Sequence, residues 1–306
     1  IEKNHRKLQI AMTKLYPGNL VLSLSSGIMY HRLVDRITAL NDVPREPLVP
    51  RRLGKNMCVP FGKILRGKVV PNTVTKTLHT DKVYEPDLNS FTSEPFPYYS
   101  PLKSQIETIK SFDRPVILVD DLVHTANRLQ VLVPQLREDG IPIKKVVVGV
   151  LSGYGRDLMQ CLKVPVESIY SMPNVRQWFV ESTLYPFIGG DTVRREEMKV
   201  AGLQPSINMI LPYATPRLSG CSREALVEFS ACCIENSRDL FQVLEAEYRK
   251  MYAKNLTLSR LSEAVILPLC PDKGSCMEYD ENLAASVYLE NDLETLWRMK
   301  EFMIKG

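Results

Sequence analysis

The chain has 306 residues, of which 44% are hydrophobic and 24% are charged, the composition of a globular protein of about two domains. No apolar stretch approaches the roughly 20 residues that a transmembrane helix needs, and the first residues are too polar for a signal peptide. These features exclude disordered, fibrous and membrane-spanning proteins. Residues 1–200 carry 28 basic and 20 acidic side chains, whereas residues 201–306 carry 11 and 15. The basic part favours an anionic partner.

The seven cysteines include no CxxC pair, so they predict neither a disulfide framework nor a zinc site. Cys232 and Cys233 are adjacent within a helical pattern, which favours packing as their role. We therefore expect reduced thiols and a cytoplasmic protein. Because the sequence begins with Ile rather than Met, we also expect a further domain upstream.

The first two thirds of the chain alternate between predicted helices and predicted strands. Helices are predicted at 2–15, 28–40, 103–111, about 126–139 and 155–162, and strands at 57–61, 116–119, 146–151 and 164–170. A short apolar run at 20–25 precedes the second helix. The polar stretch 62–101 predicts a long loop, and a loop of that length is typical of a functional segment. Strands that are apolar throughout and alternate with helices indicate a parallel sheet covered by helices on both faces.

After about residue 205 the pattern becomes helical. Helices are predicted at 222–254, where Ser222 is a favourable N-cap, and at 258–266 and 281–303. We therefore expect two domains, an α/β domain at 1–204 and a mostly helical region at 205–306.

The predicted strand 116–119 ends in two adjacent carboxylates, Asp120 and Asp121. Ligands of open parallel sheets bind beyond the carboxyl ends of the strands, and the N-terminus of the helix that follows is suited to an anion. Carboxylates suit sugar hydroxyls, whereas Thr125 and Arg128 suit a phosphate. The segment predicts a sugar-phosphate site. The alternative is a solvated turn in which the acids only cap a helix.

The segment VILVDDLVHTANRL resembles the phosphoribosyl-pyrophosphate (PRPP) signature of the type I phosphoribosyltransferase family, in its apolar strand, its two acids and Thr125. In that family the acids bind the ribose hydroxyls and the next loop holds the 5′-phosphate. The resemblance implies these roles for Asp120 and Asp121, with Mg²⁺ held largely through the ligand. It implies phosphate binding by His124, Thr125, Ala126, Asn127 and Arg128. The last three differ from the family's Gly and small residues, so we expect a reshaped loop.

Other segments follow the order of the same family. Ser25, Ser26 and Gly27 come after the apolar run 20–25, in the position of the family's pyrophosphate loop. The stretch 62–101 matches the family's mobile loop, which excludes water from the reaction. Within it, Arg66 and Lys68 are implied as pyrophosphate contacts. Trp178 or Phe179, with Asp191, is implied near a base, and packing in a core is the alternative for the two aromatic residues.

The resemblance implies a transferase in which PRPP, with Mg²⁺, gives its phosphoribose to a nitrogen nucleophile such as a nucleobase and releases pyrophosphate. Asp120, Asp121, Arg66 and Lys68 are the implied catalytic residues. The alternative is a non-catalytic module that senses PRPP or a nucleotide, which the altered residues 126–128 favour. The expected partner is a small phosphorylated sugar or nucleotide, and a homodimer is compatible with the sequence. Nucleic acid is not an expected partner, because the basic pairs are scattered and form no known motif.

Overall fold

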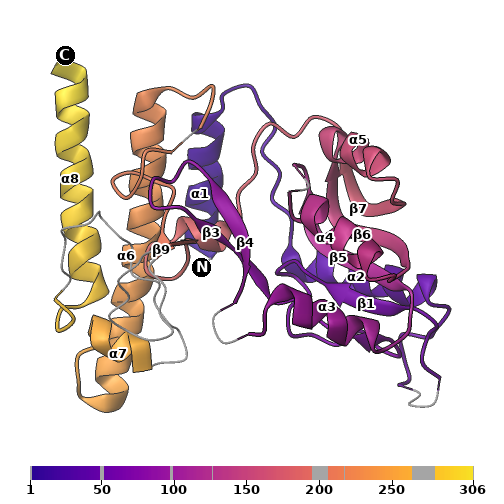
Figure 1. Ribbon diagram of the computed structural model, residues 1–306. Helices are drawn as coiled ribbons and strands as arrows, with labels where there is room; N and C mark the ends of the chain where they lie inside the picture. The colour runs from indigo at the N-terminus through magenta and orange to yellow at the C-terminus, as the bar shows by residue number, and fades with distance from the viewer. Residues whose placement is uncertain are drawn as a thin grey trace. The chain divides into compact units, whose positions relative to one another are not determined.

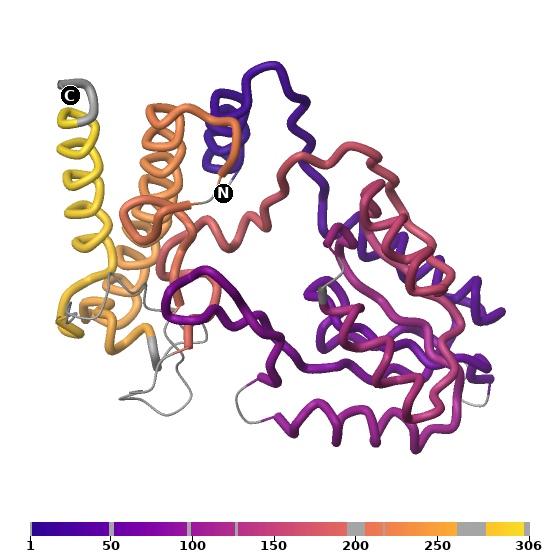
Figure 2. Tube along the Cα trace, turned by 45° about the horizontal axis from the view of Figure 1, so that its top comes forward, coloured from indigo at the N-terminus to yellow at the C-terminus, as the bar shows by residue number. Residues whose placement is uncertain are grey.

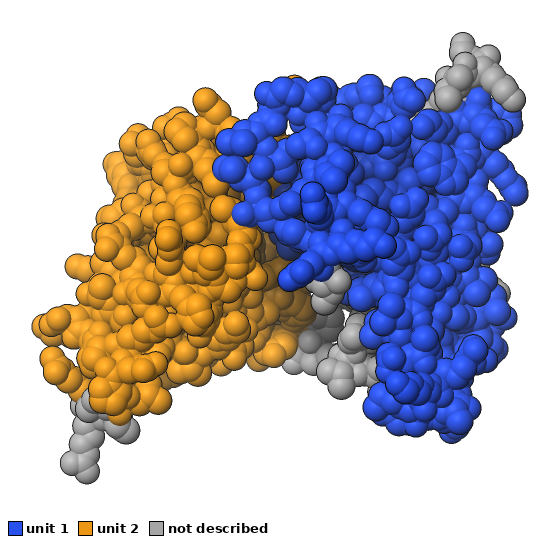
Figure 3. Space-filling model, turned by 180° about the vertical axis from the view of Figure 1, so that it is seen from behind, with its two compact units in different colours: residues 1–23, 82–92, 179–306 blue, residues 24–81, 93–178 orange. Residues whose placement is uncertain are grey.

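The computed structural model describes residues 2–48, 52–96, 99–125, 127–194, 206–216, 218–263 and 280–305. The chain forms two compact units (Figure 3). We call Leu24–Asp81 with Ser93–Trp178 the sheet unit, and Ile1–Ser23, Lys82–Thr92 and Phe179–Gly306 the helical unit. This division differs from the predicted boundary between residues 204 and 205, because three separate segments build the helical unit.

The sheet unit contains a five-stranded parallel sheet in the order β2-β1-β5-β6-β7 (Figure 1). Its strands are β1 (Met57–Pro60), β2 (Val74–Thr75), β5 (Val116–Val123), β6 (Ile143–Ser152) and β7 (Val166–Met172). In the centre, Val119 of β5 pairs with Pro60 on one side and with Val147 on the other. The strand order reverses between β1 and β5, and such a reversal is where ligands bind in open α/β sheets.

Two apolar layers cover this sheet, because successive side chains of a strand point to opposite faces. The first layer, which includes Met57, Leu118 and Val148, packs with α3 (Leu102–Lys110), α4 (Asn127–Glu138) and α5 (Gly153–Cys161). The second layer, which includes Cys58, Ile117 and Val147, packs with α2 (Ser26–Leu40) and residues 64–70. Helices therefore cover both faces of a parallel sheet, and the predicted fold class is confirmed.

The helical unit is built from α1 (Glu2–Leu15), α6 (Arg223–Tyr252), α7 (Leu258–Glu263) and α8 (Ala285–Lys305), with a short 3-10 helix η1 (Glu181–Leu184). α6 lies between α1 and α8 and packs against both (Figure 2). A small sheet in the order β4-β3-β8-β9 joins β3 (Thr80–Tyr84), β4 (Phe91–Pro95), β8 (Asp191–Val193) and β9 (Ser206–Ile207). The predicted C-terminal helices are present, and Ser222 caps α6 by accepting a hydrogen bond from the Ala225 N–H. None of the helices described is long and apolar enough to cross a membrane.

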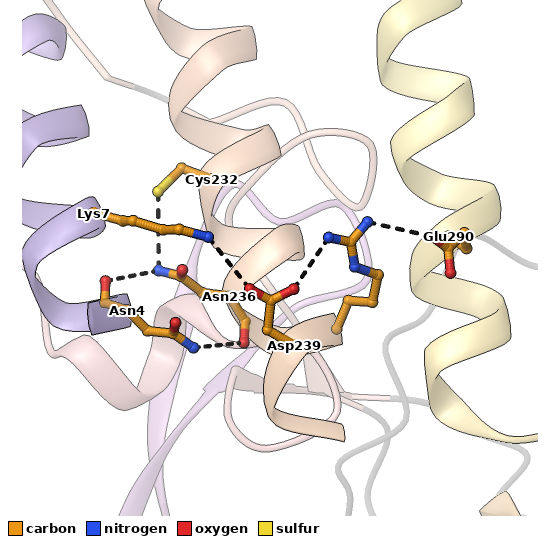
Figure 4. A network of polar contacts seen from close by, with 7 residues as sticks. Asn4, Lys7, Cys232, Asn236, Asp239 and Glu290 are labelled. Carbon is orange, nitrogen blue, oxygen red and sulfur yellow. Dashed lines mark hydrogen bonds and ion pairs between the residues drawn. The ribbon is translucent and has the colours of Figure 1, made fainter. Parts of the chain in front are cut away.

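Polar side chains connect the three long helices of the helical unit (Figure 4). Asn4 and Asn236 exchange hydrogen bonds of 3.1 and 3.0 Å, each side-chain amide donating to the other residue's carbonyl oxygen. Lys7 of α1 pairs with Asp239 of α6 at 3.3 Å. Asp239 also pairs with Arg238, which reaches Glu290 of α8 at 3.3 Å. These contacts hold α1 and α8 to the two sides of α6.

The apolar run 20–25 belongs to none of the described strands, and Leu20 and Leu22 are 83% and 56% exposed. One sequence prediction is wrong, because the described part of 62–101 is not a structureless loop. It contains β2 at the edge of the parallel sheet and then β3 and β4, which belong to the small sheet.

Candidate functional site

The carboxyl ends of β1 and β5 lie side by side at one edge of the sheet unit, which we call the acid edge. Residues 61–64 form the turn after β1, and residues 124–126 connect β5 to α4. β5 is longer than predicted and includes both carboxylates. Since α4 starts at Asn127, the positive end of its dipole faces this edge. The acid edge thus combines two carboxylates, a turn and a helix N-terminus.

Asp120 is only 4% exposed, and its carboxylate is hydrogen-bonded to neighbouring groups of the protein. Its carboxylate accepts hydrogen bonds from Arg128 Nη2 at 3.2 and 3.4 Å and from the Asp121 N–H at 2.8 Å. Nη1 of the same guanidinium donates to the Phe61 carbonyl oxygen at 2.7 Å. Burial raises the pKa of Asp120 to about 7, although Arg128 opposes this shift. Asp120 is therefore tied through Arg128 to the turn after β1.

Asp121 is partly buried and binds the backbone of that turn. Its Oδ2 accepts from the Lys63 N–H at 3.0 Å and its Oδ1 from the Ile64 N–H at 2.8 Å. A carboxylate has about four acceptor positions, so Asp121 keeps some free. Gly62 lies against both acids, since a Cβ there would collide with Asp120 Oδ1 and lie 2.7 Å from Asp121 Oδ1. The turn can approach the acids this closely only because residue 62 has no side chain.

Of the two basic residues predicted in 62–101, Arg66 lies near the acid pair. Its guanidinium stacks 4.4 Å from the Phe96 ring centroid, and Nη2 donates to the Thr80 carbonyl at 3.0 Å. Burial lowers the pKa of Arg66, and the charge of Asp81 and, to a smaller extent, those of Asp121 and Asp120 oppose that shift. Its Nε is buried without a hydrogen-bond partner. Lys68 instead holds its Nζ 4.2 Å from the centroid of the Tyr30 ring on α2.

The connection between β5 and α4 is held on one side by His124. Its Nδ1 lies 2.9 Å from Ser152 Oγ, which also accepts the Gly155 N–H at 2.9 Å and so caps α5. The His124 ring is tilted against Tyr154, with centroids 5.9 Å apart. Thr125 is exposed. Ala126 and the side chain of Asn127 lie outside the described residues.

The other predicted residues lie elsewhere. Ser25 caps α2 by accepting the Ile28 N–H at 3.4 Å, and Ser26 and Gly27 are exposed in the first turn of that helix. The pyrophosphate loop at Ser25, Ser26 and Gly27 stays a prediction. In the sheet unit, Trp178 is 50% exposed. In the helical unit, Phe179 packs against Phe229 with ring centroids 5.6 Å apart, and Asp191 lies 3.9 Å from Lys82.

The turn after β1 was not predicted from the sequence. The Phe61 carbonyl accepts a hydrogen bond from Arg128, Gly62 lies against both acids, and the Lys63 N–H donates to Asp121. The signal was a Gly followed by Lys directly after the strand predicted at 57–61. Ser152, which holds His124, was also missed, although it directly follows the predicted strand 146–151.

The acid edge offers few ligands for a metal. Among the described residues, no group of three or more His, Cys, Asp or Glu side chains could hold a metal ion. Mg²⁺ prefers oxygen ligands and commonly takes one or two from carboxylates and others from substrate phosphates. Asp121, whose carboxylate keeps acceptor positions free, therefore fits Mg²⁺ together with a phosphate-bearing ligand, whereas Asp120 is buried and paired with Arg128.

No family model and no curated protein sequence matches this chain. Several solved structures are similar to it. A purine phosphoribosyltransferase from Pyrococcus horikoshii is 12% identical, with a TM-score of 0.30 over 57% of this chain and 90% of its own. An adenine phosphoribosyltransferase from Thermoanaerobacter pseudethanolicus is 9% identical, with a TM-score of 0.29 over 54% and 99%. A hypoxanthine phosphoribosyltransferase from Trypanosoma cruzi is 15% identical, with a TM-score of 0.30 over 52% and 81%.

Proposed function

We propose that the acid edge binds a phosphorylated ribose, either PRPP or a nucleoside monophosphate, and that the protein is phosphoribosyltransferase-like. The observation that carries this proposal is the position of Asp120 and Asp121. They lie near the carboxyl end of the central strand β5, beside the reversal of strand order, and the N-terminus of α4 follows within a few residues. Carboxylates accept hydrogen bonds from sugar hydroxyls, and a helix N-terminus binds phosphate.

The proposed reaction is transfer of phosphoribose to a nitrogen nucleophile such as a nucleobase. The bond between C1 of the ribose and the pyrophosphate oxygen breaks, and a bond from C1 to the nitrogen forms. Arg128, in the first turn of α4, would hold the 5′-phosphate, and Arg66 would stabilise the charge of the departing pyrophosphate. Mg²⁺ bound with the ligand would add positive charge at the same place. Trp178 is the candidate for contact with the base in the sheet unit.

A second candidate is binding of the same ligand without turnover. The observation that favours it is that both acids already have partners inside the protein. Asp120 is bonded to Arg128, and Asp121 is bonded to the backbone of residues 63 and 64. Such a module would report the presence of PRPP or a nucleotide.

Calorimetry with PRPP and with nucleoside monophosphates, in Mg²⁺ and at millimolar ligand, tests binding. Pyrophosphate release from PRPP with a panel of nucleobases then tests transfer. We expect binding that the double variant Asp120→Asn with Asp121→Asn weakens strongly. The control is Glu107→Gln, which removes an exposed acid on α3 and should leave binding unchanged.

The outcomes separate the candidates. Pyrophosphate release that the double variant abolishes supports the transferase. Binding without release, with every base, supports the non-catalytic module. Binding that the double variant does not reduce contradicts the assignment of the acid edge, and no binding of either ligand contradicts both candidates.

A further inference from the structure

The two adjacent acids of the acid edge are held in different ways. The Asp120 side chain is 6% exposed and pairs with a guanidinium, whereas Asp121 is partly buried and pairs with backbone N–H groups. We propose that Asp120 is a positioning residue: it holds Arg128 ready to bind the phosphate of the ligand, and Asp121 alone among the two offers oxygens to the sugar. This inference rests on the proposed function and assigns different roles to two residues that the sequence pattern treats alike.

Burial makes direct contact between Asp120 and a sugar unfavourable. Gly62 lies directly against Asp120 Oδ1, and this oxygen also accepts a hydrogen bond of 2.8 Å from the Asp121 N–H. The turn after β1 is kept in place by hydrogen bonds from the Phe61 and Gly62 N–H groups to the Val119 carbonyl, at 3.0 and 3.4 Å. A hydroxyl could reach Asp120 only if this turn moved.

Arg128 has the geometry of a prepared anion donor. It stands in the first turn of α4, and its guanidinium extends from Asp120 on β5 to the Phe61 carbonyl after β1. Its side chain is 32% exposed, about five times the exposed fraction of the Asp120 side chain. In the part of the chain that the structure describes, its Nε–H has no hydrogen-bond partner. An anion would therefore find a free donor beside the positive end of α4.

Restricting the Arg128 guanidinium in the free protein should increase the affinity for the ligand. A long side chain loses conformational freedom when it binds a ligand, and this loss weakens affinity. The bonds to Asp120 and Phe61 restrict Arg128 in the free protein, so less freedom remains to be lost. The carboxylate is thus expected to act on the ligand through Arg128.

A double-mutant cycle with ribose 5-phosphate as the probe tests this. We expect Arg128→Gln to weaken binding roughly a hundredfold and Asp120→Asn roughly tenfold. Asp120→Asn should have no further effect once Arg128 is Gln. Asp121→Asn is the matched control, and its effect should remain in the Arg128→Gln background. A full Asp120→Asn effect in that background would overturn the proposal.

A second measurement needs no folded variant at position 120. Nitrogen-15 NMR of the Arg128 side chain in the unaltered protein should show restricted rotation of the guanidinium, and its Nε–H should shift on titration with ribose 5-phosphate. A freely rotating guanidinium would overturn the inference even if the protein binds the ligand. If the guanidinium is held but no phosphorylated ribose binds, the proposed function fails, and the ligand-binding role of Arg128 fails with it.

Discussion

The sheet unit and the helical unit use their polar side chains differently. In the sheet unit, Asp120, Asp121 and Arg128 gather at the carboxyl ends of two neighbouring strands. In the helical unit, polar side chains are spread along helix contacts, as when Asn236 joins α6 to α1 and Glu245 caps the start of α8 through Ser286. Side chains gathered at a sheet edge can serve a ligand, whereas side chains spread between helices fix how the helices pack.

The two tryptophans allow this comparison to be tested unit by unit. Trp178 belongs to the sheet unit and Trp297 to α8 of the helical unit, and the chain has no other tryptophan. Fluorescence of Trp297→Phe therefore follows the sheet unit, and fluorescence of Trp178→Phe follows the helical unit.

The largest expected effect is a pH dependence of the stability of the sheet unit. The pKa of Asp120 is about 7 in the folded protein, against an ordinary value of 3.8, because the carboxyl is buried. The folded state therefore holds this proton more tightly, so the free energy of unfolding falls as pH rises from about 4 to about 7, by on the order of 4 kcal/mol. Urea unfolding across this range should show the fall, and Asp120→Asn should remove it. If the free energy of unfolding fell as steeply with pH in Asp120→Asn, the fall would not come from Asp120.

Asp239 of the helical unit should act in the opposite direction. Burial raises its pKa, but hydrogen bonds from Arg238 and Lys7 outweigh burial and keep the pKa below 3.8. The stability that this group contributes is therefore present above about pH 4 and is lost as pH falls through the lower folded value. Acid unfolding followed by Trp297 should begin at higher pH in Lys7→Met. If acid unfolding began at the same pH in Lys7→Met, the result would argue against a stabilising pair of Lys7 and Asp239.

Gly62→Ala should destabilise the sheet unit by about 3 kcal/mol, since its Cβ would collide with the buried Asp120 carboxylate. The control is Gly27→Ala in α2, where the nearest atom to the new Cβ is Ser25 Oγ at 3.7 Å. That change should be neutral or slightly stabilising, because Ala favours helix. Urea midpoints of the two variants, read from Trp178, make the comparison. Equal midpoints would mean that the turn does not lie against the acids.

Asn236→Ala should destabilise the helical unit by about 2 kcal/mol, because it removes a buried side chain together with its hydrogen bond to the Asn4 carbonyl. The sheet unit should keep its stability. Asn19→Ala is a suitable control, since its side chain bonds only the carbonyls of its own turn. A loss of stability reported by Trp178 would show that the units do not unfold separately.

Ser152→Ala should cost about 1 kcal/mol, because Ser152 caps α5. Ser222 caps α6 of the helical unit with the same chemistry. Ser152 also holds His124, so its replacement should cost more than Ser222→Ala when each is read in its own unit. If Ser222→Ala lowered the free energy of unfolding more than Ser152→Ala in chemical unfolding, the result would argue against a structural role for the His124 contact.

The sequence predicted the elements whose signals are local. The strands at 116–119 and 146–151 are apolar throughout because both faces of the sheet are covered, and Ser222 marks the start of α6. Asp120 and Asp121 were also predicted at the end of the central strand, which the structure extends past them. Their proposed ligand stays a prediction.

Contacts between distant segments were not predictable in this way. Gly62 and Asp121 are 59 positions apart, and no local pattern shows that the turn after β1 lies against the acids. The two-residue strand β2 is too short to leave a periodic signal. Trp178 and Phe179 are adjacent, yet the boundary between the units falls between them. The pairing of Asp120 with Arg128 depends on how α4 returns to the sheet, which only the packed structure specifies.

The segmented helical unit has a consequence for the order in which the protein folds during synthesis. α1 is made early, but the carbonyl and amide of Asn236 that it binds are 232 residues further along the chain. The sheet unit, complete at residue 178, can form while α1 has no helix to pack against. Leu8 and Leu15, buried in the finished protein, would stay exposed to water until α6 has been translated. α1, although it is made before the sheet unit, is thus among the last of the described elements to pack.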